Sequence, residues 1–196
     1  MQAWDPFSLG VGSVIHGDGA ITNLNFHREG RFLLMSTTAH SLHMIDAMTG
    51  QERKKIYAKS HGFGVVKYTH HEHSVICSSD HKSHDVRYLS LYDNKYLRYF
   101  RGHTDRVTNV SMSPTEDYFL TSSNDRSVLL WNLTSANPVA KLTLPSTIDN
   151  PYVSYDESGL IFGVLCKDNV SKRFCTKLYD ARNYEKGPFQ DISPEK

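Results

Sequence analysis

The sequence contains an internal repeat, and this repeat restricts the folds that are possible. Moving the sequence back by 86 residues aligns Val107–Met112 (VTNVSM) with Ile21–Phe26 (ITNLNF) without a gap. The same shift aligns residues 128–132 (VLLWN) with residues 42–46 (LHMID). Half of this shift is about 43 residues, which is a period typical of structural repeats.

Two weaker copies of the unit appear at about half that shift. One reads VVKY, SVICSS and VRYLSLYD, and it requires a short insertion near residues 81–85. The other reads YVSY, LIFGV and TKLYD. We therefore predict one repeat region over residues 1–196, with units at approximately 16–58, 62–100, 102–144 and 148–192. The third run of each unit is expected to close on Asp46, Asp93, Asn132 or Asp180.

Each unit predicts a small antiparallel β-sheet. It contains three short runs of β-branched or aromatic residues separated by turn residues, and a fourth run follows, as at Tyr96–Phe100 and residues 139–144. Runs such as VLLW and LIFGVL are apolar at successive positions, which is expected of strands covered on both faces. The pattern predicts an all-β fold, a β-propeller with about four four-stranded blades.

Composition and charge narrow the possible partners and compartments. The 22 Lys and Arg residues nearly balance 21 Asp and Glu residues, so the formal charge of +1 provides no overall field to attract nucleic acid or an anionic membrane. The first basic residue is Arg28, and no segment approaches about 18 consecutive apolar residues. We therefore expect no signal peptide, no membrane span and an intracellular location. Cys77, Cys166 and Cys175 are widely spaced, which favours reduced thiols over disulfides or a zinc site.

Four polar side chains of the third unit can form one continuous chain of hydrogen bonds. In a four-stranded blade His103 precedes the first strand, Thr121 lies on the second, Asp125 lies in the next turn, and Trp131 ends the third strand. Trp131 can only donate and Asp125 can only accept, whereas the hydroxyl and the imidazole can do both. We expect this structural tetrad to lock the blade, with bonds running from Trp131 through Thr121 and His103 to Asp125.

The same residue types could form the active site of a hydrolase, with Thr121 as the nucleophile and His103 as the base. A nucleophile must be accessible, whereas Thr121 lies within YFLTSS, a strand by its pattern. The chain also contains no GxSxG motif. We therefore predict no catalytic residue.

A second enzyme hypothesis is metal-dependent chemistry at the histidine-rich segment that contains His70, His71 and His73, with His81 and His84 nearby. This segment falls where the other units have an exposed turn, and no Cys or carboxylate pattern completes a tetrahedral ligand set. We therefore predict no metal ion and no cofactor.

Three short segments are candidates for contacts with partners. Arg106 follows His103 at the entry to a first strand, and Asn124 directly precedes the turn Asp125, so both can face a partner or serve as ordinary turn residues. An arginine there suits a phosphate or carboxylate group, because its guanidinium donates two parallel bonds. The inserted loop at residues 80–85 adds His81, Lys82 and His84.

Basic and aromatic residues also interleave between Lys95 and Arg106, which is a mixture used to bind single-stranded nucleic acid. Strand alternation would place Leu97 and Tyr99 on one side and Arg98 on the other. We interpret this segment as the outer strand of a blade and do not expect direct nucleic-acid binding.

The third unit resembles the WD repeat, through Gly102-His103, the turn Asp125 and the closing Trp131-Asn132. The other units close with Ile45-Asp46, Tyr92-Asp93 and Tyr179-Asp180 and lack the histidine of the Gly-His pair. A narrower resemblance is carried by RYLSLYDNKYLRYFRGH in the middle of the chain and by GLIF, KLYDAR and KGPF after residue 158. These motifs are similar to those of the WD-repeat protein 82 family, also called the Swd-two family.

This resemblance implies a non-catalytic scaffold or adaptor of the nucleus. Its expected partners are subunits of SET-type (COMPASS) histone methyltransferase complexes, phosphatase-targeting or messenger-RNA 3′-end processing subunits, and the phosphorylated tail of RNA polymerase II. The alternative is a generic WD-repeat interaction protein of another complex. Because members of this family typically have seven blades, we expect an open or partial propeller here. The strand expected at residues 8–15 would then lack its usual partner.

Overall fold

The computed structural model describes residues 12–193 and consists of sixteen β-strands in four sheets. The first sheet contains β1 (Ile21–Phe26), β2 (Phe32–Thr37), β3 (Ser41–Asp46) and β4 (Gln51–Tyr57). The second contains β5 (Val66–Tyr68), β6 (Ser74–Ser78), β7 (Val86–Ser90) and β8 (Tyr96–Phe100). The third contains β9 (Val107–Met112), β10 (Tyr118–Ser123), β11 (Ser127–Asn132) and β12 (Ala140–Thr143). The fourth contains β13 (Ile148–Tyr155), β14 (Ile161–Asp168), β15 (Phe174–Asp180) and β16 (Gln190–Ile192), with a short 3-10 helix at Tyr184–Lys186 before the last strand.

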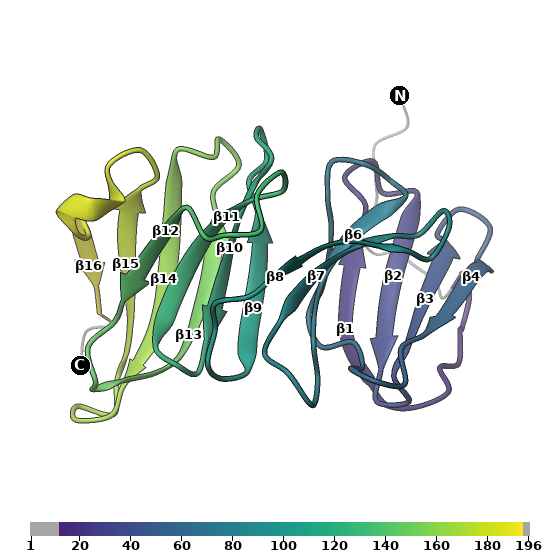
Figure 1. Cartoon of the computed structure of the whole chain (residues 1–196), viewed down its shortest axis with the longest axis horizontal. Helices are drawn as coiled ribbons and strands as arrows, with labels where there is room; N and C mark the ends of the chain where they lie inside the picture. The colour runs from purple at the N-terminus through teal and green to yellow at the C-terminus, as the bar shows by residue number, and fades with distance from the viewer. Residues whose placement is uncertain (1–11, 194–196) are drawn as a thin grey trace.

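The four strands of each sheet are hydrogen-bonded in chain order and antiparallel, so each sheet is one propeller blade. Every blade falls within one of the predicted repeat units. The blades stand side by side in chain order, and the first and fourth lie at opposite ends of an open arc (Figure 1). The predicted all-β, four-bladed, open propeller is therefore confirmed. Residues 12–193 contain no helix with the length and hydropathy of a membrane-spanning segment.

The hydrophobic core is divided into three layers, one between each pair of neighbouring blades. Strands of the middle blades contribute to two layers at once, because successive side chains point to opposite faces. On β10, for example, Phe119 packs toward the second blade and Leu120 toward the fourth. This geometry explains the apolar residues at successive positions in the middle blades.

The fourth blade differs from this expectation because only one of its faces is covered. On β14, Phe162 and Val164 are buried against the third blade, whereas Ile161 and Leu165 are exposed. The run LIFGVL was expected to be covered on both faces, and this prediction is wrong for the described residues, where the fourth blade has one neighbouring blade.

The closing position of the second blade also differs from the sequence prediction. In the other blades, Asp46, Asn132 and Asp180 pair with the first residue of the preceding strand, and in the second blade Ser90 makes this pairing, with Ser74. Asp93 lies three residues later, in the turn. Tyr92 is 84% exposed and does not fill the core position of Trp131. The tyrosine and aspartate of LSLYD resemble in composition the residue pairs that close the other blades, but β7 ends at Ser90, before them.

Polar side chains on the first strand of a blade form hydrogen bonds with the backbone of the next blade. The two partners are about one repeat length apart in sequence. In the first blade, Oδ1 of Asn23 and Oδ1 of Asn25 accept hydrogen bonds from the backbone N–H groups of Val66 and Tyr68, at 3.2 and 2.8 Å. These N–H groups lie on β5, which is the edge strand of the second sheet, so they have no partner strand on that side.

The third blade repeats this arrangement with the fourth. Asn109 donates to the carbonyl oxygen of Val153 at 2.9 Å, and Oγ of Ser111 accepts from the N–H of Tyr155 at 3.0 Å. Asn23 and Asn109 are equivalent positions in the 86-residue alignment. These contacts cap the backbone of one edge strand with side chains of the preceding blade.

The strand expected at residues 8–15 lies largely outside the described residues. Its described part, residues 12–15, contains no strand.

Candidate functional site

The predicted tetrad residues of the third blade are brought together in one hydrogen-bond chain. Nε1 of Trp131 donates to Oγ1 of Thr121 at 2.8 Å. The same oxygen lies 2.7 Å from Nε2 of His103, whose Nδ1 lies 3.0 Å from Oδ2 of Asp125. Because a carboxylate can only accept, Nδ1 carries the proton of the neutral ring and donates to Asp125. Nε2 then accepts from the hydroxyl of Thr121, whose oxygen accepts from Trp131.

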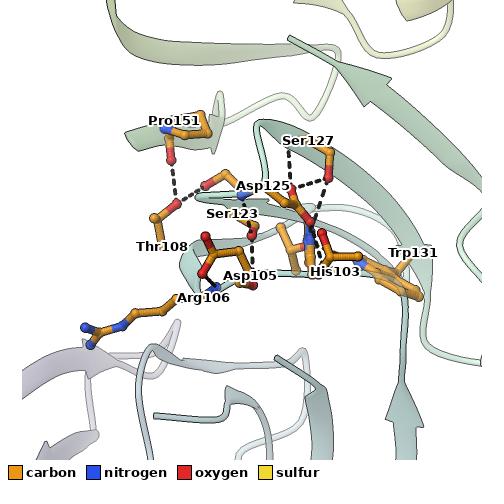
Figure 2. Close-up of polar contacts among 12 residues, drawn as sticks. His103, Asp105, Arg106, Thr108, Ser123, Asp125, Ser127, Trp131 and Pro151 are labelled. Carbon is orange, nitrogen blue, oxygen red and sulfur yellow. Dashed lines mark hydrogen bonds and ion pairs between the residues drawn. The ribbon is translucent and has the colours of Figure 1, made fainter. Parts of the chain in front are cut away.

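Asp125 connects this chain to the turn between β10 and β11 (Figure 2). Its Oδ2 also accepts from the N–H of Thr104 at 2.9 Å, and its Oδ1 accepts from the N–H and the hydroxyl of Ser127 at 2.9 and 2.6 Å. Burial by itself would raise the pKa of Asp125, but these hydrogen bonds outweigh burial and lower the pKa. The carboxylate is therefore ionised and fully engaged in holding the turn.

The tetrad provides no accessible nucleophile. Thr121 is 0% exposed, and its hydroxyl is occupied by Trp131 and His103. Burial lowers the pKa of His103, and this effect exceeds the opposing effect of Asp125. The imidazole is therefore neutral at neutral pH and acts as a buried bridge between two hydrogen bonds.

The glycine of the Gly-His pair has a steric role. A Cβ atom on Gly102 would lie 3.0 Å from a methyl carbon of Leu129 and 3.1 Å from the Trp131 ring. The absence of a side chain therefore lets the segment before β9 approach the closing tryptophan closely enough for His103 to reach Thr121.

The first blade contains a second buried polar network, which was not predicted from the sequence. It is centred on His43 of β3, whose Nε2 lies 2.8 Å from Oγ of Ser41 and 3.2 Å from Oδ1 of Asp18. Nδ1 of His43 lies 2.7 Å from Oε2 of Glu52 on β4. The hydrogen bond from Ser41 and those from Lys55 and Thr37 lower the pKa of Asp18 against the effect of burial. The pair Ser41 and His43 is the sequence feature that could have indicated this network. In the 86-residue alignment, Ser41 matches Ser127 of the tetrad turn.

Arg106 and Asn124 lie next to one another at the same end of the third blade. The N–H of Asn124 donates to the carbonyl oxygen of Arg106 at 3.0 Å, and both residues are exposed. The side chain of Arg106 extends away from the tetrad (Figure 2), and its Nη2 lies 3.1 Å from Oδ1 of Asp80. Asp80 begins the inserted loop of the second blade, so Arg106 bridges the second and third blades.

The inserted loop therefore belongs to the same surface as Arg106. Within it, Lys82 and His84 are exposed, whereas His81 is half-buried and packs against His40 of the first blade, with 4.4 Å between the ring centroids. We call the surface formed by Arg106, Asn124 and residues 80–85 the loop face. Four of the five predicted partner residues are exposed on it, and His81 is turned inward.

The histidine-rich segment and the segment of interleaved basic and aromatic residues form ordinary parts of the fold, a turn and an outer strand. His70, His71 and His73 lie in the turn between β5 and β6, as expected, and no set of three metal-ligating atoms within residues 12–193 includes any of them. In β8, Leu97 and Tyr99 are exposed while Phe100 is buried, which is the alternation of an outer strand.

Comparison with known proteins agrees with this architecture. The WD domain, G-beta repeat model matches residues 94–132, which span the last strand of the second blade and the tetrad region of the third. The chain is 41% identical over 175 residues to Protein ANTHESIS POMOTING FACTOR 1 of Arabidopsis thaliana, covering 87% of this chain and 51% of the relative.

Two further relatives carry informative names. COMPASS component SWD2 of Saccharomyces cerevisiae is 37% identical over 171 residues, with 87% of this chain and 50% of the relative covered. WD repeat-containing protein 82 of Drosophila melanogaster is 36% identical over 169 residues, with 86% of this chain and 51% of the relative covered. The chain thus spans about half the length of the curated relatives it matches. With its four blades and its tetrad, the chain contains a WD repeat and is homologous to the proteins named COMPASS component SWD2 and WD repeat-containing protein 82.

Proposed function

We propose that this chain is a non-catalytic scaffold that docks subunits of a Set1/COMPASS-type histone methyltransferase complex in the nucleus. The observation that carries the proposal is its homology, over 86–87% of its length, to proteins named as a COMPASS component and as WD repeat-containing protein 82. The enclosed tetrad supports a structural rather than a catalytic use of His103 and Thr121.

The loop face is the proposed docking surface. Arg106 has a 62% exposed side chain, so its guanidinium can donate to a ligand while one nitrogen remains bound to Asp80. Lys82 and His84 add two further donors on the same surface. This chemistry suits an acidic or phosphorylated peptide segment of a partner, and the phosphorylated tail of RNA polymerase II is one ligand of this class. Phosphatase-targeting and 3′-end processing subunits are proposed as further partners on the same basis.

Affinity purification of the tagged chain from nuclear extract, followed by mass spectrometry, tests this proposal. We expect recovery of SET-domain methyltransferase subunits, or of phosphatase and 3′-end processing subunits. Recovery of an unrelated complex would favour the alternative of a generic WD-repeat interaction protein. A purification without any of these subunits, at a bait level that recovers other stable partners, would contradict the proposal.

A further inference from the structure

Three side chains with metal-ligating atoms converge where the first and second blades meet. His40 lies in the turn between β2 and β3, and Asp80 and His81 begin the inserted loop between β6 and β7. One ligand atom from each of these residues lies within 4.8 Å of the other two, and all three residues are half-buried. A hairpin turn and a loop that are 40 residues apart in sequence thus present two imidazoles and a carboxylate to one point.

The two imidazoles carry nitrogen atoms without partners. Nδ1 of His40 and Nδ1 of His81 are both buried, and neither has a hydrogen-bond partner among the described residues. Both atoms face Gly62, because a Cβ atom placed on this glycine would lie 2.8 Å from the first and 3.1 Å from the second. A buried polar atom is normally hydrogen-bonded because leaving it unpaired is unfavourable, so two such atoms facing one spot indicate a missing ligand.

The surrounding contacts hold the candidate ligands in place. The backbone N–H groups of Asp80 and His81 both donate to the carbonyl oxygen of His61, at 2.9 and 3.3 Å. Oδ1 of Asp80 is held by Arg106, which leaves Oδ2 for another ligand. A carboxylate oriented by a second residue is the usual outer-shell arrangement of a metal ligand.

We propose that His40, Asp80 and His81 form a binding site for a divalent transition-metal ion, with Zn²⁺ as the preferred ion. Imidazole nitrogen and carboxylate oxygen are both common zinc ligands, and neutral imidazole also suits the neighbouring transition metals. Three protein ligands leave a fourth tetrahedral position for water or for a side chain of a partner. The ion would fasten the inserted loop of the second blade to the first blade and so order part of the loop face.

Nearby positive charges limit the expected affinity. Nη2 of the buried Arg87 donates to the carbonyl oxygen of Gly62 at 3.1 Å, and Arg106 lies on the other side of Asp80. The site therefore offers a single carboxylate, which already pairs with Arg106, and a second guanidinium group is bound to the adjacent Gly62. We expect a dissociation constant for Zn²⁺ in the micromolar range rather than the much tighter binding of zinc-dependent folds.

Calorimetric titration of the chelator-treated, reduced full chain with ZnCl₂ tests the site. We expect one equivalent of Zn²⁺ to bind, to raise the melting temperature, and to lose affinity at least tenfold in His81→Gln and in Asp80→Asn. Co²⁺ should give visible d–d absorption without a thiolate charge-transfer band. Asp80→Asn preserves side-chain shape, so it decides the question if His81→Gln fails to fold.

Matched variants separate this site from other metal-binding groups of the chain. His84→Gln, in the same loop, and His73→Gln, in the histidine-rich turn, should leave the affinity unchanged. Absence of zinc binding would overturn the proposal. So would binding that survives in His81→Gln and Asp80→Asn, that disappears in His73→Gln, or that shows a thiolate band from Cys166 and Cys175. The measurement needs no binding partner, so its outcome is independent of the proposed scaffold function.

Discussion

Nε2 of His103 lies 2.7 Å from Oγ1 of Thr121, and the two residues are 18 positions apart in sequence. This bond ties the segment before β9 to the middle of β10, inside a blade whose buried side-chain nitrogen and oxygen atoms all have hydrogen-bond partners. Removal of the imidazole would therefore deprive both Thr121 and Asp125 of one hydrogen-bond partner.

His103→Ala should lower the free energy of unfolding by about 2–4 kcal/mol, which combines one neutral hydrogen bond and one bond to a carboxylate. Thermal and urea melts measure this change. The exposed His84→Ala serves as the control and should stay within about 0.5 kcal/mol of wild type. An unchanged melting temperature for His103→Ala would show that the tetrad does not stabilise the blade.

The stability of the chain should fall on mild acidification, partly through His103. Burial holds the folded-state pKa of His103 below its ordinary value of 6.5, so the unfolded chain binds more protons between these two pKa values. This contribution is complete above pH 6.5 and is lost as the pH falls below it, with a slope of at most about 1.4 kcal/mol per pH unit.

Urea melts between pH 7.5 and 5.5 check this prediction. Asp18 and Asp125 have lowered pKa values and therefore stay ionised in the folded state across this range. Burial also lowers the pKa of His61, so wild type is compared with His103→Gln to isolate one histidine. Equal pH slopes in the two proteins would exclude a contribution from His103.

Arg106→Gln should weaken binding of a phosphorylated peptide about tenfold, which corresponds to ~1.4 kcal/mol. The variant removes the guanidinium charge but keeps a polar side chain, so the fold should be intact. Fluorescence titration with phosphorylated and unphosphorylated forms of one peptide measures the effect. Arg182→Gln, an exposed arginine after β15, is the matched control. Equal affinities of Arg106→Gln and wild type for the phosphorylated form would remove Arg106 from the docking surface.

Asn25→Ala should destabilise the contact between the first and second blades by about 1–3 kcal/mol, because the N–H of Tyr68 loses its acceptor. Differential scanning calorimetry compares this variant with Asn137→Ala, which changes an exposed turn residue. A melting temperature equal to that of the Asn137 variant would mean that water replaces the amide at no cost.

The chain should self-associate through the outer faces of its end blades. Leu24 and Phe26 on β1 are 53% and 57% exposed, and Leu165 on β14 is 41% exposed. Large apolar side chains exposed at both ends of the molecule favour association. Light scattering should show a mass that rises with concentration, and Leu24→Ser combined with Leu165→Ser should reduce it. A monomeric wild-type chain at all concentrations would contradict this expectation.

The repeat period and the tetrad could be predicted from sequence because both depend on spacing along the chain. The 86-residue alignment places residues on equivalent strands, and the hydrogen-bonding capacities of Trp131, Thr121, His103 and Asp125 allow one order of bonds. The closing position of the second blade could not be read in this way. Tyr92-Asp93 has the composition of a closing pair, and only the pairing of Ser74 with Ser90 reveals where the strand ends.

The contacts between blades also could not be predicted from the spacing of residues along the chain. The Thr-Asn pair is present in both ITNLNF and VTNVSM, but the role of the asparagine appears only when the next edge strand lies beside it. Likewise His40 and His81 lie in different repeat units. The sequence places His81 near the histidine-rich segment, whereas in the structure its ring packs against His40. Such sites depend on how blades are placed against each other.

The caps formed by Asn23, Asn25, Asn109 and Ser111 also bear on how the molecule acquires its structure. Each reaches only to the next blade, 43 or 44 residues further along the chain. A blade that has formed thus offers its successor a template of fixed side-chain groups for the backbone of its first strand. Structure can then propagate from one blade to the next, as in other repeat proteins, without closure of the whole ring as a precondition.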